Sequence, residues 1–140
     1  TWNIQIMATD IDETVLARAR AGVYGDRSMR HVPADYRDRH FLARGSYHQI
    51  RLETAELVSF SYLNLHERAA MRAMRHFDFV FCRNVLIYFD DLSRQSTVDH
   101  FFHALNPGGF LFLGHSESVG RISNSFRLRR MDRHLMYMRP

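Results

Sequence analysis

The sequence contains a single cysteine, no lysine and no long hydrophobic run. Because Cys82 has no partner in the chain, an internal disulfide and a zinc site made of several cysteines are both excluded. No apolar stretch approaches the roughly 20 residues that a membrane helix needs, and the first residues lack the basic and apolar regions of a signal peptide. These absences predict a cytoplasmic protein with no membrane insertion and no metal site.

The charged residues are unusual because all 19 basic residues are arginine, and the net charge is +4. A positive balance permits an acidic partner such as nucleic acid, a membrane surface or an acidic protein segment, but it does not choose among them. Most of the arginines are scattered along the chain and are expected to be solvated. Hydrophobic residues make up 46% of the sequence, which indicates one soluble globular domain.

Hydrophobic periodicity predicts strands that alternate with helices, which is typical of an α/β domain with a mainly parallel sheet. Asp12 is expected to cap a helix that Gly22 ends. The polar stretch 24–40 is expected to be a loop with at most one helical turn, and two short strands around a turn are expected within 41–52. The remaining elements are strands at 4–8, 58–65, 77–82 and 110–113, a helix ending near 105, and a hairpin of 126–131 with 134–138. The strand 77–82 is nearly all apolar and is expected to be buried on both faces.

Asp10 follows the first strand. In doubly wound folds, an acidic residue at this place accepts hydrogen bonds from ribose hydroxyls, because one carboxylate can accept both. The alternative is that Asp10 or Asp12 only caps the following helix, and this feature alone favours the cap.

Polar residues also follow the strand 77–82. Open α/β sheets bind ligands at the carboxyl ends of their strands, where Arg83 could pair with a carboxylate and Tyr88 could donate a hydrogen bond. Equally, this segment could be a connecting loop with Arg83 turned to solvent.

The segment 114–118, Gly-His-Ser-Glu-Ser, follows the strand 110–113. His115 and Glu117 suggest either acid–base chemistry or a hydrogen-bonded turn. His100 and His103 have the spacing of metal ligands, but no third ligand is evident. The residues around Ser116 do not form a nucleophile elbow, which excludes hydrolase chemistry.

Taken together, these segments resemble the chemotaxis-receptor methyltransferase (CheR) family over nearly the whole chain. The most specific parts are Cys-Arg-Asn-Val-Leu-Ile-Tyr-Phe at 82–89 and Gly-His-Ser-Glu at 114–117. Ala-Thr-Asp-Ile-Asp at 8–12, Asn-Leu at 64–65 and Pro-Gly-Gly at 107–109 occur in the family's order.

The resemblance implies a class I, Rossmann-like, S-adenosylmethionine-dependent methyltransferase fold. It also implies methyl transfer from S-adenosylmethionine to glutamate side chains in the cytoplasmic region of a chemoreceptor, with S-adenosylhomocysteine as product. Asp10 would then hold the ribose of the cofactor, and Asn64 and Leu65 would flank its adenine. Arg83 and Asn84 would line the cofactor and methyl-transfer site, and Arg83 and Tyr88 would position the reacting groups.

The resemblance also implies that residues 1–140 are a partial methyltransferase domain. A small antiparallel β-subdomain is expected as an insertion at approximately 40–57, and a β-hairpin is expected at the C-terminus. The fold has the strand order 3-2-1-4-5-7-6, and the chain lacks the first strand and its glycine-rich loop. The sheet should therefore be split, and its exposed strands should cause self-association unless the missing part comes from elsewhere.

Two other functions remain open at this point. A truncated methyltransferase fold could serve as a non-catalytic module for protein interaction. A nucleic-acid methyltransferase is suggested only by the positive charge. The chain has Arg-Asn-Val-Leu at 83–86, where many base-amino methyltransferases carry Asn/Asp-Pro-Pro-aromatic, so no nucleic-acid partner is expected.

Overall fold

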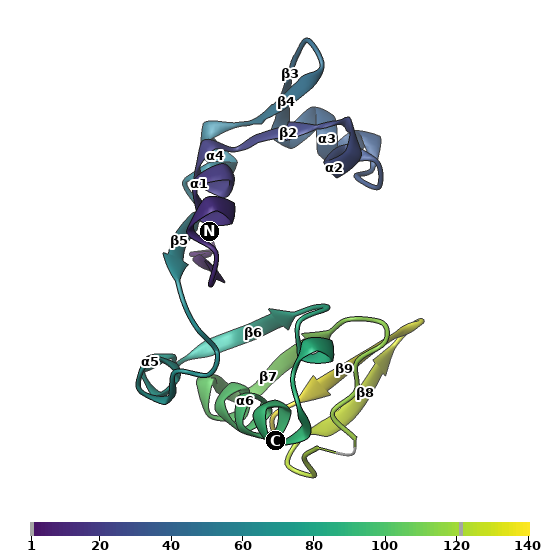
Figure 1. Ribbon diagram of the computed structural model, residues 1–140. Helices are drawn as coiled ribbons and strands as arrows, with labels where there is room; N and C mark the ends of the chain where they lie inside the picture. The colour runs from purple at the N-terminus through teal and green to yellow at the C-terminus, as the bar shows by residue number, and fades with distance from the viewer. Residues whose placement is uncertain (1, 121) are drawn as a thin grey trace. The chain divides into compact units, whose positions relative to one another are not determined.

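The computed structural model describes residues 2–120 and 122–140 and divides into two compact units, 1–64 and 65–140 (Figure 1). In the described part of the first unit the elements are β1 (Ile6–Asp10), α1 (Glu13–Ala21), β2 (Val23–Gly25), α2 (Asp26–Met29), α3 (Ala34–His40), β3 (Phe41–Arg44), β4 (Tyr47–Ile50), α4 (Leu52–Ala55) and β5 (Val58–Tyr62). Those of the second unit are α5 (Arg68–Ala73), β6 (Phe77–Cys82), the 3-10 helix η1 (Leu86–Tyr88), α6 (Asp91–Ala104), β7 (Leu105–Leu113), β8 (Arg127–Met131) and β9 (His134–Met138). None of the described helices is long and apolar enough to cross a membrane.

In the first unit, β1 and β5 form a parallel pair, and α1 contacts both strands. The predicted cap of α1 is confirmed, because the Asp12 carboxylate accepts hydrogen bonds from the backbone N–H groups of Thr14 and Val15 at 2.7 and 3.3 Å. The predicted end is also confirmed: Gly22 has φ 64° and its N–H donates to carbonyls of the last turn. A left-handed residue that closes a helix in this way is most readily glycine.

A three-stranded antiparallel sheet with the order β2-β4-β3 follows α1. The two short strands expected within 41–52 are confirmed as β3 and β4, joined at Gly45 with φ 60°. The prediction of a loop over 24–40 is wrong, because this stretch contains α2, α3 and the last two residues of β2, which pairs with β4. Sequence reasoning treated Pro33 only as a breaker, although proline fits well at a helix N-terminus, where its missing N–H costs nothing.

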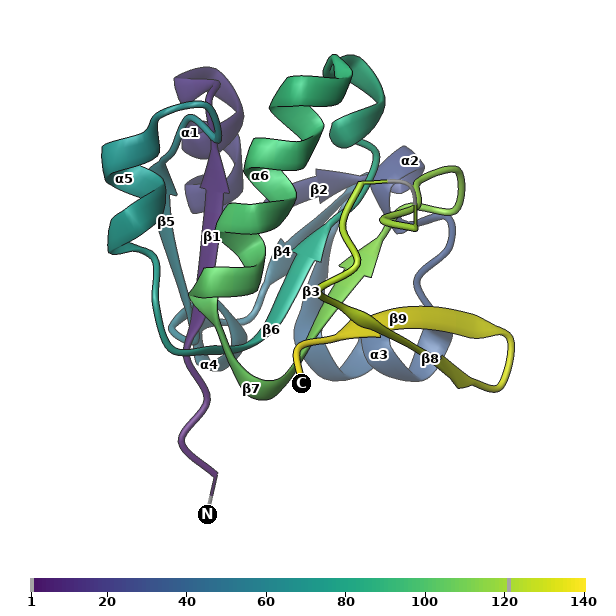
Figure 2. The ribbon, with the colours of Figure 1, turned by 90° about the horizontal axis from the view of Figure 1, so that it is seen from below.

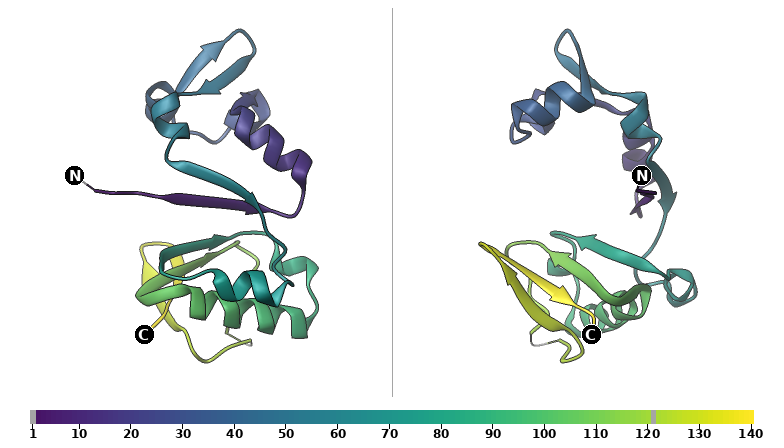
Figure 3. Two further views of the ribbon diagram at one scale, coloured as in Figure 1. Left: turned by 90° about the vertical axis from the view of Figure 1, so that its left-hand side faces the viewer. Right: turned by 180° about the vertical axis from the view of Figure 1, so that it is seen from behind.

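In the second unit, four strands form a sheet with the order β6-β7-β9-β8. The first two are parallel, β9 is antiparallel to β7, and β8 and β9 form the expected antiparallel hairpin. In Figures 1 and 3, α6 lies along one face of this sheet. The face of α6 toward the sheet follows from its i, i+3, i+4 spacing of apolar residues. The buried core includes Val98, Phe101, Ala104, Leu105, Leu111 and Met136.

Burial of β6 on both faces is the second prediction that the structure contradicts. Cys82 is buried, but the side chains of Phe79 and Phe81 are 58% and 69% exposed. They lie on the same face as Phe110 and Phe112, and the Phe81 and Phe112 rings stack at 4.6 Å between centroids. Side chains alternate between the two faces of a strand. The helix α6 covers one face of the sheet, whereas no described residue buries Phe79 and Phe81 on the opposite face.

Two of the observed sheets each reproduce a part of the expected strand order. β1 lies beside β5 as the second and third strands of the fold would, and β6-β7-β9-β8 reproduces the order 4-5-7-6.

Candidate functional site

The carboxyl ends of β6 and β7 place two polar segments next to each other. These strands are parallel and in register up to Cys82 and Leu113. The segment 83–88 leaves β6, and the segment 114–118 leaves β7, at the same edge of the sheet. Parallel pairing therefore brings together two motifs that are about 30 residues apart in sequence.

A single carboxylate joins the two segments. One oxygen of Glu117, Oε2, accepts hydrogen bonds from the backbone N–H groups of Gly114 and Asn84, both at 2.7 Å. The other, Oε1, accepts from the N–H groups of Val85 and Leu86 at 3.0 and 2.8 Å. Hydrogen bonds to an ionised acceptor are stronger than neutral ones. Four of them fix the start of the 83–88 segment against the turn that follows β7.

The backbone around Glu117 has two further constraints. Asn84 has φ 59°, a left-handed conformation that asparagine tolerates better than most residues. At Gly114, an added Cβ would lie 2.5 Å from Asn84 Oδ1 and 2.5 Å from Glu117 Oε2. Only glycine therefore lets the two segments approach this closely.

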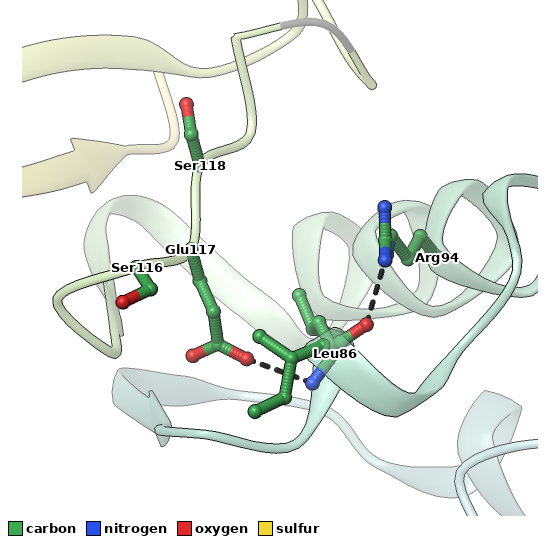
Figure 4. A pocket seen from close by; sticks show the side chains of 6 residues that line it. Leu86, Arg94, Ser116, Glu117 and Ser118 are labelled. Atoms are coloured by element: carbon green, nitrogen blue, oxygen red, sulfur yellow. Dashed lines mark hydrogen bonds between the residues drawn. The ribbon is translucent and has the colours of Figure 1, made fainter.

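Arg94 of α6 supports the same segment from its other side. Its Nε donates to the carbonyl oxygen of Leu86 at 2.8 Å, and its Nη1 lies 3.3 Å from Asp91 Oδ1. Figure 4 shows Leu86 between Glu117, which accepts from its N–H, and Arg94, which donates to its carbonyl. A small pocket of about 100 Å³ lies here, lined by Leu86, Ile87, Arg94, Ser116, Glu117 and Ser118.

The environment also sets the protonation of two groups. Burial raises the pKa of the Glu117 carboxyl, but the backbone N–H donors of Asn84, Gly114, Leu86 and Val85 outweigh burial and hold that pKa below its usual value. Glu117 is therefore ionised at neutral pH and acts as an acceptor. Burial, followed by the negative charge of Glu117, raises the pKa of the Cys82 thiol to about 12, which makes Cys82 an unreactive neutral thiol.

The structure places Arg83, Asn84 and Tyr88 together on the segment that Glu117 holds. Arg83 is exposed, and Tyr88, at the end of η1, is 82% exposed. Their apolar neighbour Leu86 is buried and anchors the segment to the unit. Both candidate positioning side chains thus project from a fixed backbone into accessible space.

Asp10 and Asn64 lie in the first unit, at the carboxyl ends of the parallel strands β1 and β5. Asp10 pairs in register with Tyr62, and its backbone carbonyl accepts from the N–H of Leu63 at 3.0 Å. Asp10 Oδ1 also accepts from the N–H of Asp12 at 2.9 Å. Asp12 is therefore the helix cap, while the Asp10 carboxylate lies at the strand end, beside the chain that leads to Asn64. Leu65 is the first residue of the second unit.

Sequence reasoning left the role of Glu117 open between acid–base chemistry and a hydrogen-bonded turn. The structure shows the turn, and it also shows bonds to Asn84, Val85 and Leu86 that the sequence did not predict. The available signal was a glutamate three residues after a glycine at a strand end.

Comparison with known proteins gives the family. Residues 1–135 match the family described as "CheR methyltransferase, SAM binding domain". The chain belongs to this family. Within it, the chain is 42% identical over 140 residues to "Chemotaxis protein methyltransferase 2" of Vibrio cholerae, covering 99% of the chain and 48% of that protein.

Two more relatives show how widely the similarity extends. "Chemotaxis protein methyltransferase" of Klebsiella aerogenes is 42% identical over 130 residues, covering 89% of the chain and 44% of that protein. "Probable biofilm formation methyltransferase WspC" of Pseudomonas aeruginosa is 35% identical over 114 residues, covering 81% and 27%. The chain therefore spans about half the length of the first two of these CheR-family relatives.

A solved structure supports the fold. The magnesium protoporphyrin IX methyltransferase of Synechocystis, determined with bound S-adenosylmethionine, matches with a TM-score of 0.56 at 16% identity, covering 97% of the chain and 60% of that protein. The fold is thus the Rossmann-like fold of S-adenosylmethionine-dependent methyltransferases.

The cofactor of this family's domain is S-adenosylmethionine. The residues of the chain fit such a group, because the Asp10 carboxylate lies at a strand end, where it can accept hydrogen bonds from ribose hydroxyls.

Proposed function

We propose that the protein containing this chain transfers methyl groups from S-adenosylmethionine to glutamate side chains in the cytoplasmic region of a chemoreceptor. The observation that supports this most directly is the 83–88 segment, which carries an accessible arginine and an accessible tyrosine on a backbone fixed by Glu117. The names of the chemotaxis relatives supply the biological context.

The methyl transfer requires alignment of the reacting groups but no general base. S-adenosylmethionine, when bound, supplies a methyl group on a positively charged sulfur. A carboxylate oxygen of the substrate forms the new bond to the methyl carbon as the carbon–sulfur bond breaks, and S-adenosylhomocysteine leaves. A glutamate side chain is already ionised at neutral pH, so no residue has to remove a proton. The protein mainly aligns the reacting groups, and orientation can supply about 7–11 kcal/mol at most.

The residues of this chain divide that task. Asp10 accepts hydrogen bonds from the ribose hydroxyls, and Asn64 and Leu65 flank the adenine. Asn84 lines the cofactor side of the 83–88 segment. Arg83 and Tyr88 position the substrate carboxylate: Arg83 attracts its charge, and Tyr88 donates a hydrogen bond.

A methylation assay tests the function. The full-length protein is incubated with labelled S-adenosylmethionine and, in parallel, a glutamate-containing receptor peptide and an RNA. We expect alkali-labile methyl esters on the peptide only, because esters of glutamate hydrolyse in base. Label on the RNA, or none on the peptide, would contradict the proposal.

Replacing Asp10 by asparagine should weaken cofactor binding by about 30-fold. This corresponds to about 2 kcal/mol, the size of a hydrogen bond to a charged group. The measurement is titration calorimetry of the full-length protein with S-adenosylhomocysteine. Asp12→Asn is the matched control: it removes the same charge two residues away but keeps the helix cap, so its affinity should change by less than about twofold. Equal effects of both substitutions would refute the ribose role of Asp10.

The isolated 140-residue chain is expected to self-associate. In the part of the chain that the structure describes, β6 lies at one end of the four-stranded sheet with its outer edge unpaired, and the side chains of Phe79 and Phe81 are exposed. Unpaired edges and open apolar faces promote pairing between copies. Light scattering should therefore give a mass above that of one chain, and Phe79→Ser/Phe81→Ser should lower it. A monomer at micromolar concentration would show that the prediction is wrong.

A further inference from the structure

The β8–β9 hairpin carries a cluster of positive charge that the proposed roles do not use. Four exposed arginines lie within seven residues, and the only acid among them is Asp132: the cluster is Arg127, Arg129, Arg130 and Arg133. All five residues of β8 are exposed. Within residues 2–120 and 122–140, none of these arginines forms an ion pair. Arg130 Nε donates to the backbone carbonyl of Asp132 at 2.9 Å, and no carboxylate of the described residues neutralises the charge of the four arginines, which is therefore available to a partner.

The base of the hairpin is held firmly, so the cluster has a defined position. The hydroxyl of Tyr137, which is buried, accepts from the N–H of Val119 at 3.3 Å and donates to Ser118 Oγ at 3.2 Å. Arg139 donates to the carbonyl of Leu105 and lies 4.8 Å above the Phe102 ring. The hairpin is thus bonded directly to the segment that contains Glu117.

The strand register puts the tip of this hairpin at the edge of the sheet where the site lies. Because β9 is antiparallel to β7, its first residue, His134, lies toward the end where β7 finishes at Leu113. The turn of Asp132 and Arg133 extends from the same end. In Figure 1 the yellow tip lies on the side to which the β6 arrow points, and Figure 2, seen from below, shows the hairpin crossing the direction of β6 at a wide angle.

The spacing suits a substrate that reaches both places. Neighbouring strands lie about 4.8 Å apart, so where the strands pair, β9 lies about 10 Å and β8 about 14 Å across the sheet from β6, whose end leads into Arg83. An α-helix advances about 5.4 Å per turn. Acidic side chains two to three turns from a glutamate at Arg83 would therefore reach the arginines of the hairpin.

Protection of an edge strand is the simpler explanation of these charges, since charged residues on an edge discourage aggregation. Protection of an edge strand against aggregation can be provided by positive or by negative side chains. The exposed ionised side chains of the hairpin are instead four arginines and one acid, Asp132, and the planar guanidinium matches carboxylate groups in a bidentate way.

We propose that the arginine-rich hairpin, Arg127–His134, docks the acidic segment that flanks the methyl-accepting glutamate. This inference rests on the proposed function, because it assigns a partner surface to the same site. The arginines attract the segment and orient it along the edge of the sheet, so that one of its glutamates faces Arg83 and Tyr88. They raise affinity without touching the reacting atoms.

The test uses charge reversal in the full-length protein, with two fluorescent peptides as probes. One peptide has an accepting glutamate flanked by glutamates two and three helical turns away, and the other has glutamine at the flanking positions. The variant is Arg129→Glu/Arg133→Glu, which keeps a charged edge. The matched control is Arg68→Glu/Arg72→Glu, on the exposed helix α5 that leads into the opposite end of β6. Arg129→Gln/Arg133→Gln is the second variant, for use if reversal impairs folding.

At low salt, the hairpin variants should raise both the Kd from fluorescence anisotropy and the KM of the glutamate-flanked peptide by about tenfold, and leave kcat within about twofold. The difference should largely disappear near 0.5 M salt, where screening is strong. The glutamine-flanked peptide and the α5 control should show changes below about twofold. An unchanged KM and Kd, an equal change for both peptides, or tighter binding of an RNA of equal charge at the hairpin would overturn the proposal.

The outcomes separate the two proposals. If the wild-type protein methylates no glutamate but loses acidic-peptide binding on charge reversal, the proposed function fails and the docking surface stands. If methylation occurs and neither KM nor Kd depends on the hairpin, the function stands and the docking surface fails.

Discussion

Glu117→Ala should lower kcat by about 100-fold and reduce the free energy of unfolding by roughly 2 kcal/mol. The carboxylate accepts four backbone hydrogen bonds, of which three hold Asn84, Val85 and Leu86 and the fourth comes from Gly114. Without it the donors face water or remain unpaired, which costs about the net value of one or two charged hydrogen bonds. Displacement of Arg83 and Tyr88 by about 1 Å is enough for a 100-fold loss in rate. Initial rates and chemical denaturation measure the two effects.

Two variants separate positioning from general destabilisation. Glu117→Gln keeps the shape but has one acceptor oxygen, so it should retain about half of the bonds and show an intermediate rate at a temperature where it is fully folded. Glu67→Gln removes an exposed carboxylate that makes no capping hydrogen bond in α5, and it should change neither quantity. A folded Glu117→Ala protein with wild-type kcat would overturn the positioning role.

The pH dependence of stability should distinguish these variants as well. The pKa of Glu117 in the folded state lies below its usual value of 4.5. Its contribution is therefore complete above about pH 4.5 and is lost as the pH falls through the folded-state pKa. Glu117→Gln should lack this acid-dependent part, so that its stability approaches that of the wild type only at low pH.

Arg83→Ala should lower kcat by about 100-fold or more while the Tm changes by less than about two degrees. The side chain is exposed, so its removal leaves the core intact. What is lost is the charge that aligns the substrate carboxylate, a contribution expected from electrostatic positioning. Steady-state kinetics with the receptor peptide and thermal unfolding provide the two measurements.

A conservative change sharpens this prediction. Arg83→Lys keeps the charge but loses the planar fork, so it should recover part of the rate. Arg72→Ala removes an exposed arginine of α5 and should leave the rate unchanged. If Arg83→Ala transfers methyl groups at the wild-type rate with an intact fold, Arg83 has no role in positioning.

Much of the fold followed from local signals. Periodicity gave the main strands and α6, Asp12 gave the start of α1, and Gly22 gave its end. The stretch 24–40 could not be predicted in this way, because α2 and α3 are short and polar, and neither has a side-chain cap. Such helices depend on their surroundings more than on propensity.

The sequence also indicated which strands lead into the candidate residues. The motifs around Arg83 and Gly114 identified the family from the sequence, because long motifs of uncommon composition constrain the function that they serve. The sequence by itself determined which residues follow which strands, and therefore that Asp10, Arg83 and Glu117 lie at carboxyl ends. Only the tertiary structure decided that Glu117 bonds to three successive N–H groups after β6, and that an arginine-rich hairpin ends at the same edge. Both depend on the register between strands that are distant in sequence, and register is set by packing of the whole sheet.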